Sequence, residues 1–134
     1  MKMKKRKLII SGFIVIALLM TIMILIFSNG LEEVVNLSIN SVDLSKIEDG
    51  VYTGTYDFKR WTNTVRVHVS NHTITKIEIV SDVFGGSFVN CSDEVIRRVI
   101  EAQNTDVDAV TGATVTTNAY LKAIENALKE NSHE

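Results

Sequence analysis

Residues 8–27 form an uninterrupted apolar run that limits what the N-terminal part of this chain can become. The run contains no charged residue, and only Ser11, Gly12 and Thr21 in it are not strongly apolar. A transmembrane helix needs about 20 such residues, so the run is long enough to cross a bilayer. We therefore predict a membrane-spanning helix over residues 8–27.

A cleaved secretory signal is the alternative for this segment. Such a signal has an apolar core of roughly 7–15 residues followed by a small-x-small cleavage site. The core here is longer and residues 27–30 offer no convincing site, although an exposed junction between Asn29 and Gly30 would be open to cleavage. The chain's only cysteine, Cys91, lies far from the segment, which excludes a lipoprotein signal. An uncleaved anchor is the favoured interpretation.

Charged residues flank the apolar run unequally. Five lysines and arginines lie within residues 1–7, whereas Glu32 and Glu33 follow the run. The positive-inside rule therefore predicts a single-pass cell-membrane protein with a cytoplasmic N-terminus and an extracytoplasmic domain. From Leu31 onward nine Lys/Arg stand against sixteen Asp/Glu, a formal charge of −7. Because such a domain would repel nucleic-acid phosphates, we expect no nucleic-acid partner.

The length beyond the anchor accommodates one small domain. The segment that joins anchor to domain carries several large apolar side chains between Val34 and Leu44, too many for a free tether. Part of it is expected to pack on the domain as a short helix or an edge strand. We divide the chain into a cytoplasmic basic tail (1–7), a transmembrane anchor (8–27), a juxtamembrane linker (28–46), a domain (47–130) and a polar tail (131–134).

Three segments of the domain read as strands: 51–58, 62–69 and 74–80. In the second, Val65, Val67 and Val69 alternate with polar residues, which is typical of a strand with one buried face. Residues 70–73 form a turn in which Asn71 suits the left-handed conformation. Together these segments predict an antiparallel β-meander.

Two amphipathic segments read as helices. The first covers residues 93–103, with Ser92 as its N-cap and an apolar stripe at helical spacing. The second covers residues 118–129, with Thr116 and Thr117 as candidate N-caps. The expected fold class is therefore α+β: an antiparallel β-meander packed with two helices, preceded by one transmembrane helix.

The loop before the second helix has room for a ligand. Thr111, Gly112 and Ala113 have small side chains, and the glycine can take a positive φ. A loop of this kind that runs into a helix N-terminus presents backbone N–H groups and the positive end of the helix dipole, which suit a phosphate. Thr114 would lie beside that phosphate. The alternative is a plain glycine turn capped by threonines.

Residues 108–116, Asp-Ala-Val-Thr-Gly-Ala-Thr-Val-Thr, resemble the flavinylation motif of the FMN-binding domain family. That family includes the periplasmic flavoprotein subunits of the sodium-translocating NADH:quinone oxidoreductase and Rnf complexes, and its motif runs Asp-x-x-Ser/Thr-Gly-Ala-Thr/Ser. The similarity also takes in residues 49–55, which match an opening Asp-Gly-x-Tyr-x-Gly, and spans roughly residues 47–128.

The resemblance implies a role for each residue of the loop. Thr114 would carry FMN through a phosphoester bond, installed from FAD by a magnesium-dependent flavin transferase. The remaining members of the cofactor-binding set are the loop itself, the acidic residue of the motif and the threonine that ends the similar segment: Thr111, Gly112, Ala113, Asp108 and Thr116.

The function implied is that of a membrane-anchored, extracytoplasmic electron carrier with covalent FMN. Its partners would be the lipid bilayer, the flavin transferase and a membrane redox partner, either a dehydrogenase or a quinone-linked protein. The resemblance favours a component of a redox system over an independent enzyme. The alternatives are non-covalent FMN binding and a surface-anchored binding or structural module without flavin.

Several other side chains are candidate site residues. Trp61 could stack on a flavin or cap the sheet edge, and we favour the second. Phe84 and Phe88 are expected either to pack on the flavin ring or to fill the core. His68 and His72 would point different ways from a strand and its turn, which makes a metal site improbable. Cys91 is expected to be a small buried residue.

Overall fold

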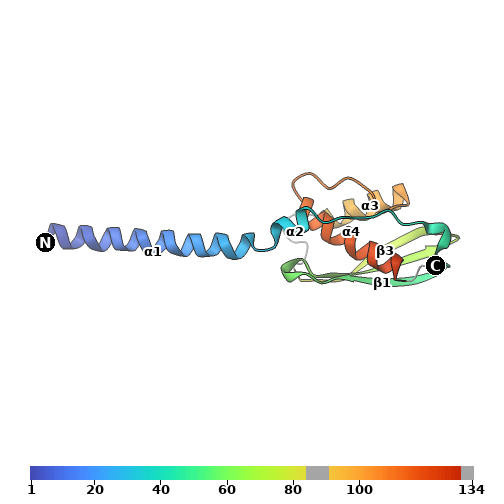
Figure 1. Cartoon of the computed structure of the whole chain (residues 1–134), viewed down its shortest axis with the longest axis horizontal. Coiled ribbons are helices and arrows are strands. Elements are labelled where there is room, and N and C mark those ends of the chain that lie inside the picture. The colour runs from blue at the N-terminus through green and yellow to red at the C-terminus, as the bar shows by residue number, and fades with distance from the viewer. Residues whose placement is uncertain (84–90, 131–134) are drawn as a thin grey trace. The chain divides into compact units, whose positions relative to one another are not determined.

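The computed structural model describes residues 1–83 and 91–130, which separate into two compact units, 1–33 and 34–134. The first unit is dominated by α1 (Lys2–Ser28), a single long helix with no buried side chain (Figure 1). Within the described residues it belongs to the one helical segment long and apolar enough to cross a membrane. Apolar side chains exposed along a whole helix are stable in a bilayer and not in water, so the anchor prediction agrees with this helix.

The second unit contains a three-stranded antiparallel sheet in the order β1-β2-β3. Its strands are β1 (Gly50–Tyr56), β2 (Asn63–Ser70) and β3 (Thr73–Asp82). Asn71 and His72 form the β2–β3 turn, and both have positive φ, 50° and 56°. Two such residues match the twist of the adjoining strands. The predicted meander is confirmed.

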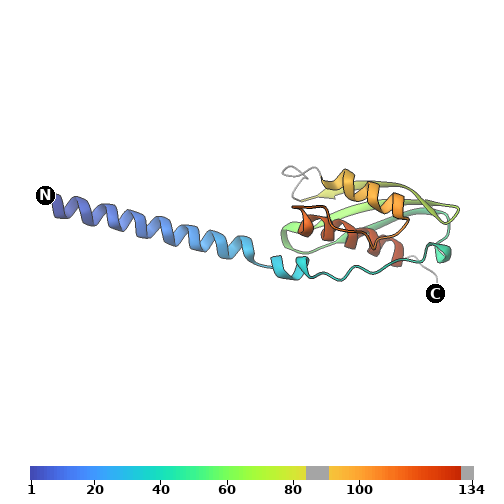
Figure 2. The ribbon, with the colours of Figure 1, turned by 90° about the horizontal axis from the view of Figure 1, so that it is seen from above.

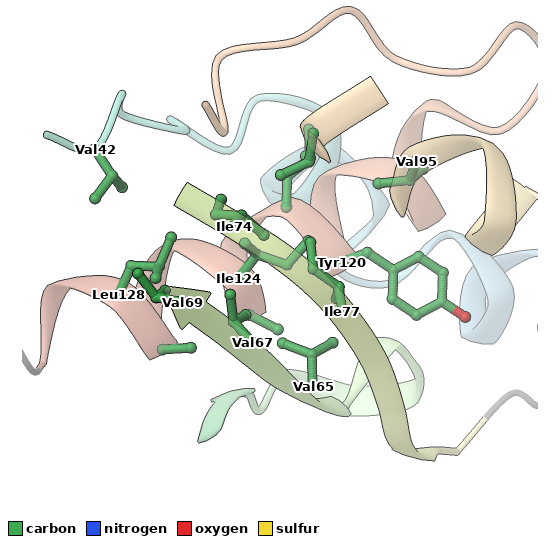
Figure 3. Close-up of a cluster of buried hydrophobic side chains, with 14 of the residues drawn as sticks. Val42, Val65, Val67, Val69, Ile74, Ile77, Val95, Tyr120, Ile124 and Leu128 are labelled. Carbon is green, nitrogen blue, oxygen red and sulfur yellow. The ribbon is translucent and has the colours of Figure 1, made fainter. Parts of the chain in front are cut away.

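Helices α3 (Cys91–Ala102) and α4 (Thr114–Lys129) cover one face of the sheet (Figure 1). Alternate residues of β2, together with Ile74 and Ile77 of β3, point toward them, and α4 supplies the opposite wall of the core (Figure 3). The predicted α+β class is therefore correct. The labelled side chains of this core are Val42, Val65, Val67, Val69, Ile74, Ile77, Val95, Tyr120, Ile124 and Leu128.

Both helices begin earlier than expected. α3 already includes Ser92, and α4 starts at Thr114, so that Thr116 and Thr117 lie in its first turn and are not its caps. The N-cap residue of α4 is Ala113, which makes no side-chain cap hydrogen bond. A threonine inside a helix can instead donate its hydroxyl to the carbonyl four residues earlier, as Thr117 does to Ala113 O at 2.7 Å.

Residues 34–47 run alongside α4 on the domain (Figure 2). The segment begins within the short helix α2 (Leu31–Val35) and contains the 3-10 turn η1 (Leu44–Lys46). Val34, Val42 and Ile47 are buried. The linker therefore packs on the domain partly as a short helix, and the compact unit starts at Val34.

Glu125 joins α4 to this segment. Only 2% of it is exposed, yet its carboxylate accepts two hydrogen bonds of 3.1 Å from the backbone N and Nδ2 of Asn40. It also pairs with Lys129 at 2.7 Å and Lys122 at 3.2 Å. Burial by itself raises the pKa of Glu125, but these hydrogen bonds outweigh it and lower the pKa from 4.5 to about 2.

Glu125→Gln should lower the free energy of unfolding by about 2 kcal/mol at neutral pH, because Asn40 and the lysines lose a charged acceptor. The folded-state pKa lies below the ordinary value, so this stabilisation is complete above pH 4.5 and is lost as the pH falls toward 2. The difference between variant and unaltered protein should shrink over that interval. Urea unfolding followed by the fluorescence of Trp61, the single tryptophan, measures it.

Glu101→Gln is the matched control, since Glu101 is 61% exposed and, among the described residues, pairs with the exposed Arg97 alone. Its effect on unfolding should be small at every pH. A Glu125→Gln difference that stays constant across the whole acidic interval would contradict the assigned role of the Glu125 carboxylate.

Candidate functional site

Arg98 holds the chain in place as it approaches the predicted flavin loop. Its Nη1 donates to the carbonyl oxygens of Asp108 at 2.9 Å and Ala109 at 3.1 Å. The guanidinium is oriented in turn by Glu94 at 2.8 Å. Arg98 thus fixes the backbone of Asp108, whose own side chain remains exposed.

Residues 110–113 form a tight turn directly before α4. Ala113 N donates to Val110 O at 2.9 Å, and Gly112, the third residue of the turn, has φ of 79°. A positive φ at this position alone is the feature of a type II turn, which strongly favours glycine. A Cβ at Gly112 would meet no atom within 4 Å, so the requirement is conformational and the space above the turn is open.

Thr117 links this turn to α4 by hydrogen bonds. Its buried hydroxyl donates to Ala113 O at 2.7 Å and accepts from Val110 N at 3.2 Å, so it contacts both ends of the turn. The sequence predicts Thr117 as a cap and does not predict this positioning role. The available signal was its spacing, one helical turn after Ala113.

Thr114 is the first residue of α4 and is exposed. Within residues 1–83 and 91–130, its hydroxyl has no hydrogen-bond partner, and no acceptor meets the backbone N–H groups of Thr114, Val115 and Thr116. Free N–H groups and the positive end of the helix dipole favour an anion at this position. The structure therefore places an unpaired hydroxyl beside backbone N–H groups that are free among the described residues.

The other predicted site residues lie in the same loop and first turn. Asp108, Thr111 and Gly112 are exposed, Ala113 is buried, and Thr116 is half-buried. Thr116 lines a cavity of about 200 Å³. The full lining of this cavity, which we call the Asn63 cavity, is Arg60, Trp61, Asn63, Asp82, Thr116, Ala119 and Tyr120.

Aromatic side chains form much of the apolar wall of the Asn63 cavity. Trp61 follows β1 in the 3-10 turn η2 (Lys59–Trp61) and is 9% exposed. It stacks on Phe58 with ring centroids 6.3 Å apart, and the Arg60 guanidinium lies 4.2 Å from its ring centroid. It also packs with Val34 and Ala119. Trp61 therefore packs at the end of the sheet, in agreement with the favoured alternative, and also lines the cavity.

Two polar side chains of the cavity differ in how they are satisfied. Tyr120 donates its hydroxyl to Asp82 Oδ2, and burial followed by this hydrogen bond raises the pKa of Tyr120, so the phenol stays protonated. Asn63 is 2% exposed, and its Nδ2 donates to Trp61 O at 3.2 Å. Its Oδ1 is buried with no hydrogen-bond partner in the described part of the chain. A buried acceptor left unpaired costs about 1–3 kcal/mol.

The remaining candidates contribute little to this site. His68 pairs with Glu78 at 2.7 Å, and His72 Nδ1 lies 2.8 Å from Ile47 O. Cys91 is buried as predicted, and burial raises the pKa of its thiol. Phe84 and Phe88 lie outside the described residues.

Comparison with known proteins gives two findings. The model of the FMN-binding domain family matches residues 61–129. An uncharacterized protein of Treponema pallidum (strain Nichols) is 29% identical over 87 residues, which cover 64% of this chain and 24% of that protein. The present chain thus matches about a quarter of the length of that relative.

The family match begins at Trp61. It includes β2, β3, both packed helices and the whole loop of residues 108–114. The free N–H groups at the start of α4 fit the phosphate of a flavin nucleotide. Because the family model covers more than half of the chain, the chain belongs to the FMN-binding domain family, and its cofactor is FMN.

Proposed function

We propose that this protein is a membrane-anchored, extracytoplasmic electron carrier whose FMN is attached to Thr114 through a phosphoester bond. The observation that carries the proposal is the position of Thr114: an exposed residue at the first turn of α4 whose hydroxyl is unpaired among the described residues. The adjacent N–H groups would bind the phosphate oxygens that such a bond leaves free.

The attachment reaction needs an outside catalyst, because a threonine hydroxyl is a weak nucleophile. Thr114 would supply the oxygen of the new phosphoester bond to the FMN half of FAD, and AMP would be the leaving group. The flavin transferase would take up the hydroxyl proton, and its Mg²⁺ would offset the charge on the phosphates. Exposure of Thr111, Gly112 and Thr114 leaves the acceptor loop open to that enzyme.

The protein's own residues then hold and surround the cofactor. The start of α4 binds the phosphate, Thr117 keeps the turn in place, and the Asn63 cavity offers an apolar wall with a few polar groups. When bound, FMN supplies one- and two-electron redox chemistry that no amino-acid side chain provides. The anchor would keep this chemistry near a dehydrogenase or a quinone-linked protein in the same membrane.

The intact mass of the full chain, produced with and without a flavin transferase, tests the attachment. We expect an increment of one FMN minus water only when the transferase is present, with yellow colour that survives denaturation. Colour that is lost on denaturation would support non-covalent FMN binding. Protein that never gains colour under either condition would support the binding-module alternative.

Orientation is tested separately on right-side-out vesicles that lack any cell wall or outer membrane. Because residues 1–7 are basic and the domain is acidic, protease added outside should digest residues beyond Gly30 and leave the anchor. Digestion should be followed with antibodies to the domain and to an N-terminal tag. Full protection of residues 51–134 in intact vesicles, with digestion after lysis, would show that the domain faces the cytoplasm.

A further inference from the structure

We propose that Arg98 is a positioning residue for flavin attachment: it holds the backbone at Asp108 and Ala109 in the conformation in which a flavin transferase binds the acceptor loop. Glu94 orients Arg98 for this role. The inference rests on the proposed function, because it concerns the enzyme that would modify Thr114. It goes further by giving α3, a helix outside the flavinylation motif, a part in presenting that motif.

Different elements hold the two halves of the acceptor loop, residues 108–114. In the second half, Thr117 of α4 bonds to both ends of the turn of residues 110–113. In the first half, the carbonyl oxygens of the first two residues accept from Arg98 Nη1 at 2.9 Å and 3.1 Å. No other hydrogen bond reaches the backbone of these two residues in the part of the chain that the structure describes. The first half therefore depends on a side chain of α3.

Close packing does not replace these hydrogen bonds. The connection from α3 to α4 covers residues 103–113 and contains neither helix nor strand (Figure 1). Asp108 is exposed and Ala109 is only half-buried. An open hollow of about 600 Å³ also separates part of this connection from α3, and it is lined by Arg98, Glu101, Ala102, Asp106, Val107 and Asp108. Hydrogen bonds from Arg98, more than burial, thus fix the start of the acceptor loop.

The direction in which Arg98 points is set within α3. Its Nε donates to Glu94 Oε1 at 2.8 Å, and a glutamate one helical turn before a basic residue is a favourable pair. Because the guanidinium is planar and rigid, a bond at Nε also directs Nη1. Hydrogen bonds from Arg97 and then Arg98 lower the pKa of Glu94 from 4.5 to about 2. Glu94 is therefore charged at neutral pH and keeps Arg98 aimed at the two carbonyls.

This arrangement suits local positioning more than global stability. The side chains of Arg98 and Glu94 are 30% and 32% exposed, and ion pairs this close to solvent contribute little to the stability of a whole domain. A loop that is ordered before binding costs a partner less to bind than a loop that must be ordered on binding. Arg98 bonds to the backbone and not to the Thr114 hydroxyl. Its loss should therefore raise the KM for the acceptor and leave kcat nearly unchanged.

The kinetic test uses the full chain in detergent, made without a flavin transferase and then mixed with purified transferase, Mg²⁺ and FAD. Covalent flavin is followed by gel fluorescence at several concentrations of the chain. We expect Arg98→Leu to raise the KM for the chain roughly tenfold and to change kcat by less than about twofold. Arg98→Lys can still donate to a carbonyl, so it should recover part of the lost affinity.

Two further variants separate positioning from a general effect on α3. Arg97→Leu is the matched control, because Arg97 bonds to Glu94 and Glu101 and not to the acceptor loop, and its KM should equal that of the unaltered chain. Glu94→Ala should raise KM about threefold, and the double variant Glu94→Ala/Arg98→Leu should match Arg98→Leu alone, since Glu94 acts through Arg98. Effects that multiply in the double variant would overturn the role assigned to Glu94.

Backbone order in the unmodified chain provides a measurement without any transferase. The ¹⁵N order parameters of the Asp108 and Ala109 amides should fall from about 0.85 to below about 0.6 in Arg98→Leu and stay unchanged in Arg97→Leu. A raised KM with unchanged order parameters would mean that Arg98 contacts the transferase directly, which would overturn the positioning role. Glu94→Ala gives the same comparison with the Arg98 side chain still present, should Arg98→Leu fold poorly.

Failure of this inference can be told apart from failure of the attachment. Equal KM values for Arg98→Leu and the unaltered chain, or a loss confined to kcat, would overturn the role of Arg98 and leave the Thr114 bond intact. If the unaltered chain never gains covalent flavin from a competent transferase, the attachment itself is wrong and this inference fails with it.

Discussion

We expect Thr114→Val to leave the domain folded and to remove all covalent FMN. A phosphoester needs a hydroxyl oxygen, and valine keeps the branched shape of threonine without one. Because Thr114 is exposed and its hydroxyl has no partner among the described residues, the change should cost less than about 0.5 kcal/mol of stability. Fluorescence of the denatured protein on a gel, together with its intact mass after coexpression with a flavin transferase, measures the loss.

Neighbouring variants serve as controls for this result. Thr114→Ser should retain at least part of the flavin, and Thr111→Val and Thr116→Val should still be modified because they leave the Thr114 oxygen in place. Asp108→Ala should impair modification without unfolding, since Arg98 holds the backbone carbonyl of Asp108 and its side chain is exposed. A full FMN increment on Thr114→Val would disprove the assignment, and flavin found on another threonine would relocate the site.

Gly54→Ala should destabilise the domain by about 3 kcal/mol or more, a cost at the upper end for overpacking. Gly54 lies in β1 where α4 crosses the sheet at very short range. A Cβ there would lie 2.2 Å from Ala123 O, 2.3 Å from Ala127 N and 2.6 Å from Ala127 Cβ. The nearest atoms belong to the helix backbone, so α4 must move away from the sheet and carry its N-terminal loop with it.

Gly50→Ala is the matched control in the same strand. A Cβ at Gly50 would meet only the Tyr52 ring at 3.4 Å, an ordinary contact, so its effect should be small. Urea unfolding followed by Trp61 fluorescence compares the two variants, and flavin loading reports on the loop. Equal stability of Gly54→Ala and Gly50→Ala would mean that α4 does not require its close approach to β1.

Several features of the protein could be predicted from short stretches of sequence. The apolar run of residues 8–27 indicated a spanning helix, and the alternation of Val65, Val67 and Val69 indicated a strand with one buried face. The motif at residues 108–114 indicated the FMN-binding domain family. Each of these signals is local, because helix and strand periodicities depend only on residues a few positions apart.

Contacts between distant segments could not be predicted in this way. No residue near Asn63 in the sequence predicts that Asn63 lines a cavity. Thr116 and Tyr120, which line the same cavity, are more than fifty residues away. The sequence also does not predict that Thr117 contacts both ends of the turn of residues 110–113 instead of capping the helix.

The sequence by itself determined the long apolar helix, the order of the strands and helices, and membership of the FMN-binding domain family. Tertiary structure decided where α4 begins, that Glu125 binds Asn40 of the preceding segment, and which side chains face the cavity. The physical reason is that periodicity and turn chemistry act along the chain. Burial and hydrogen-bond satisfaction depend instead on which distant groups the packed core of the domain brings within about 4 Å of one another.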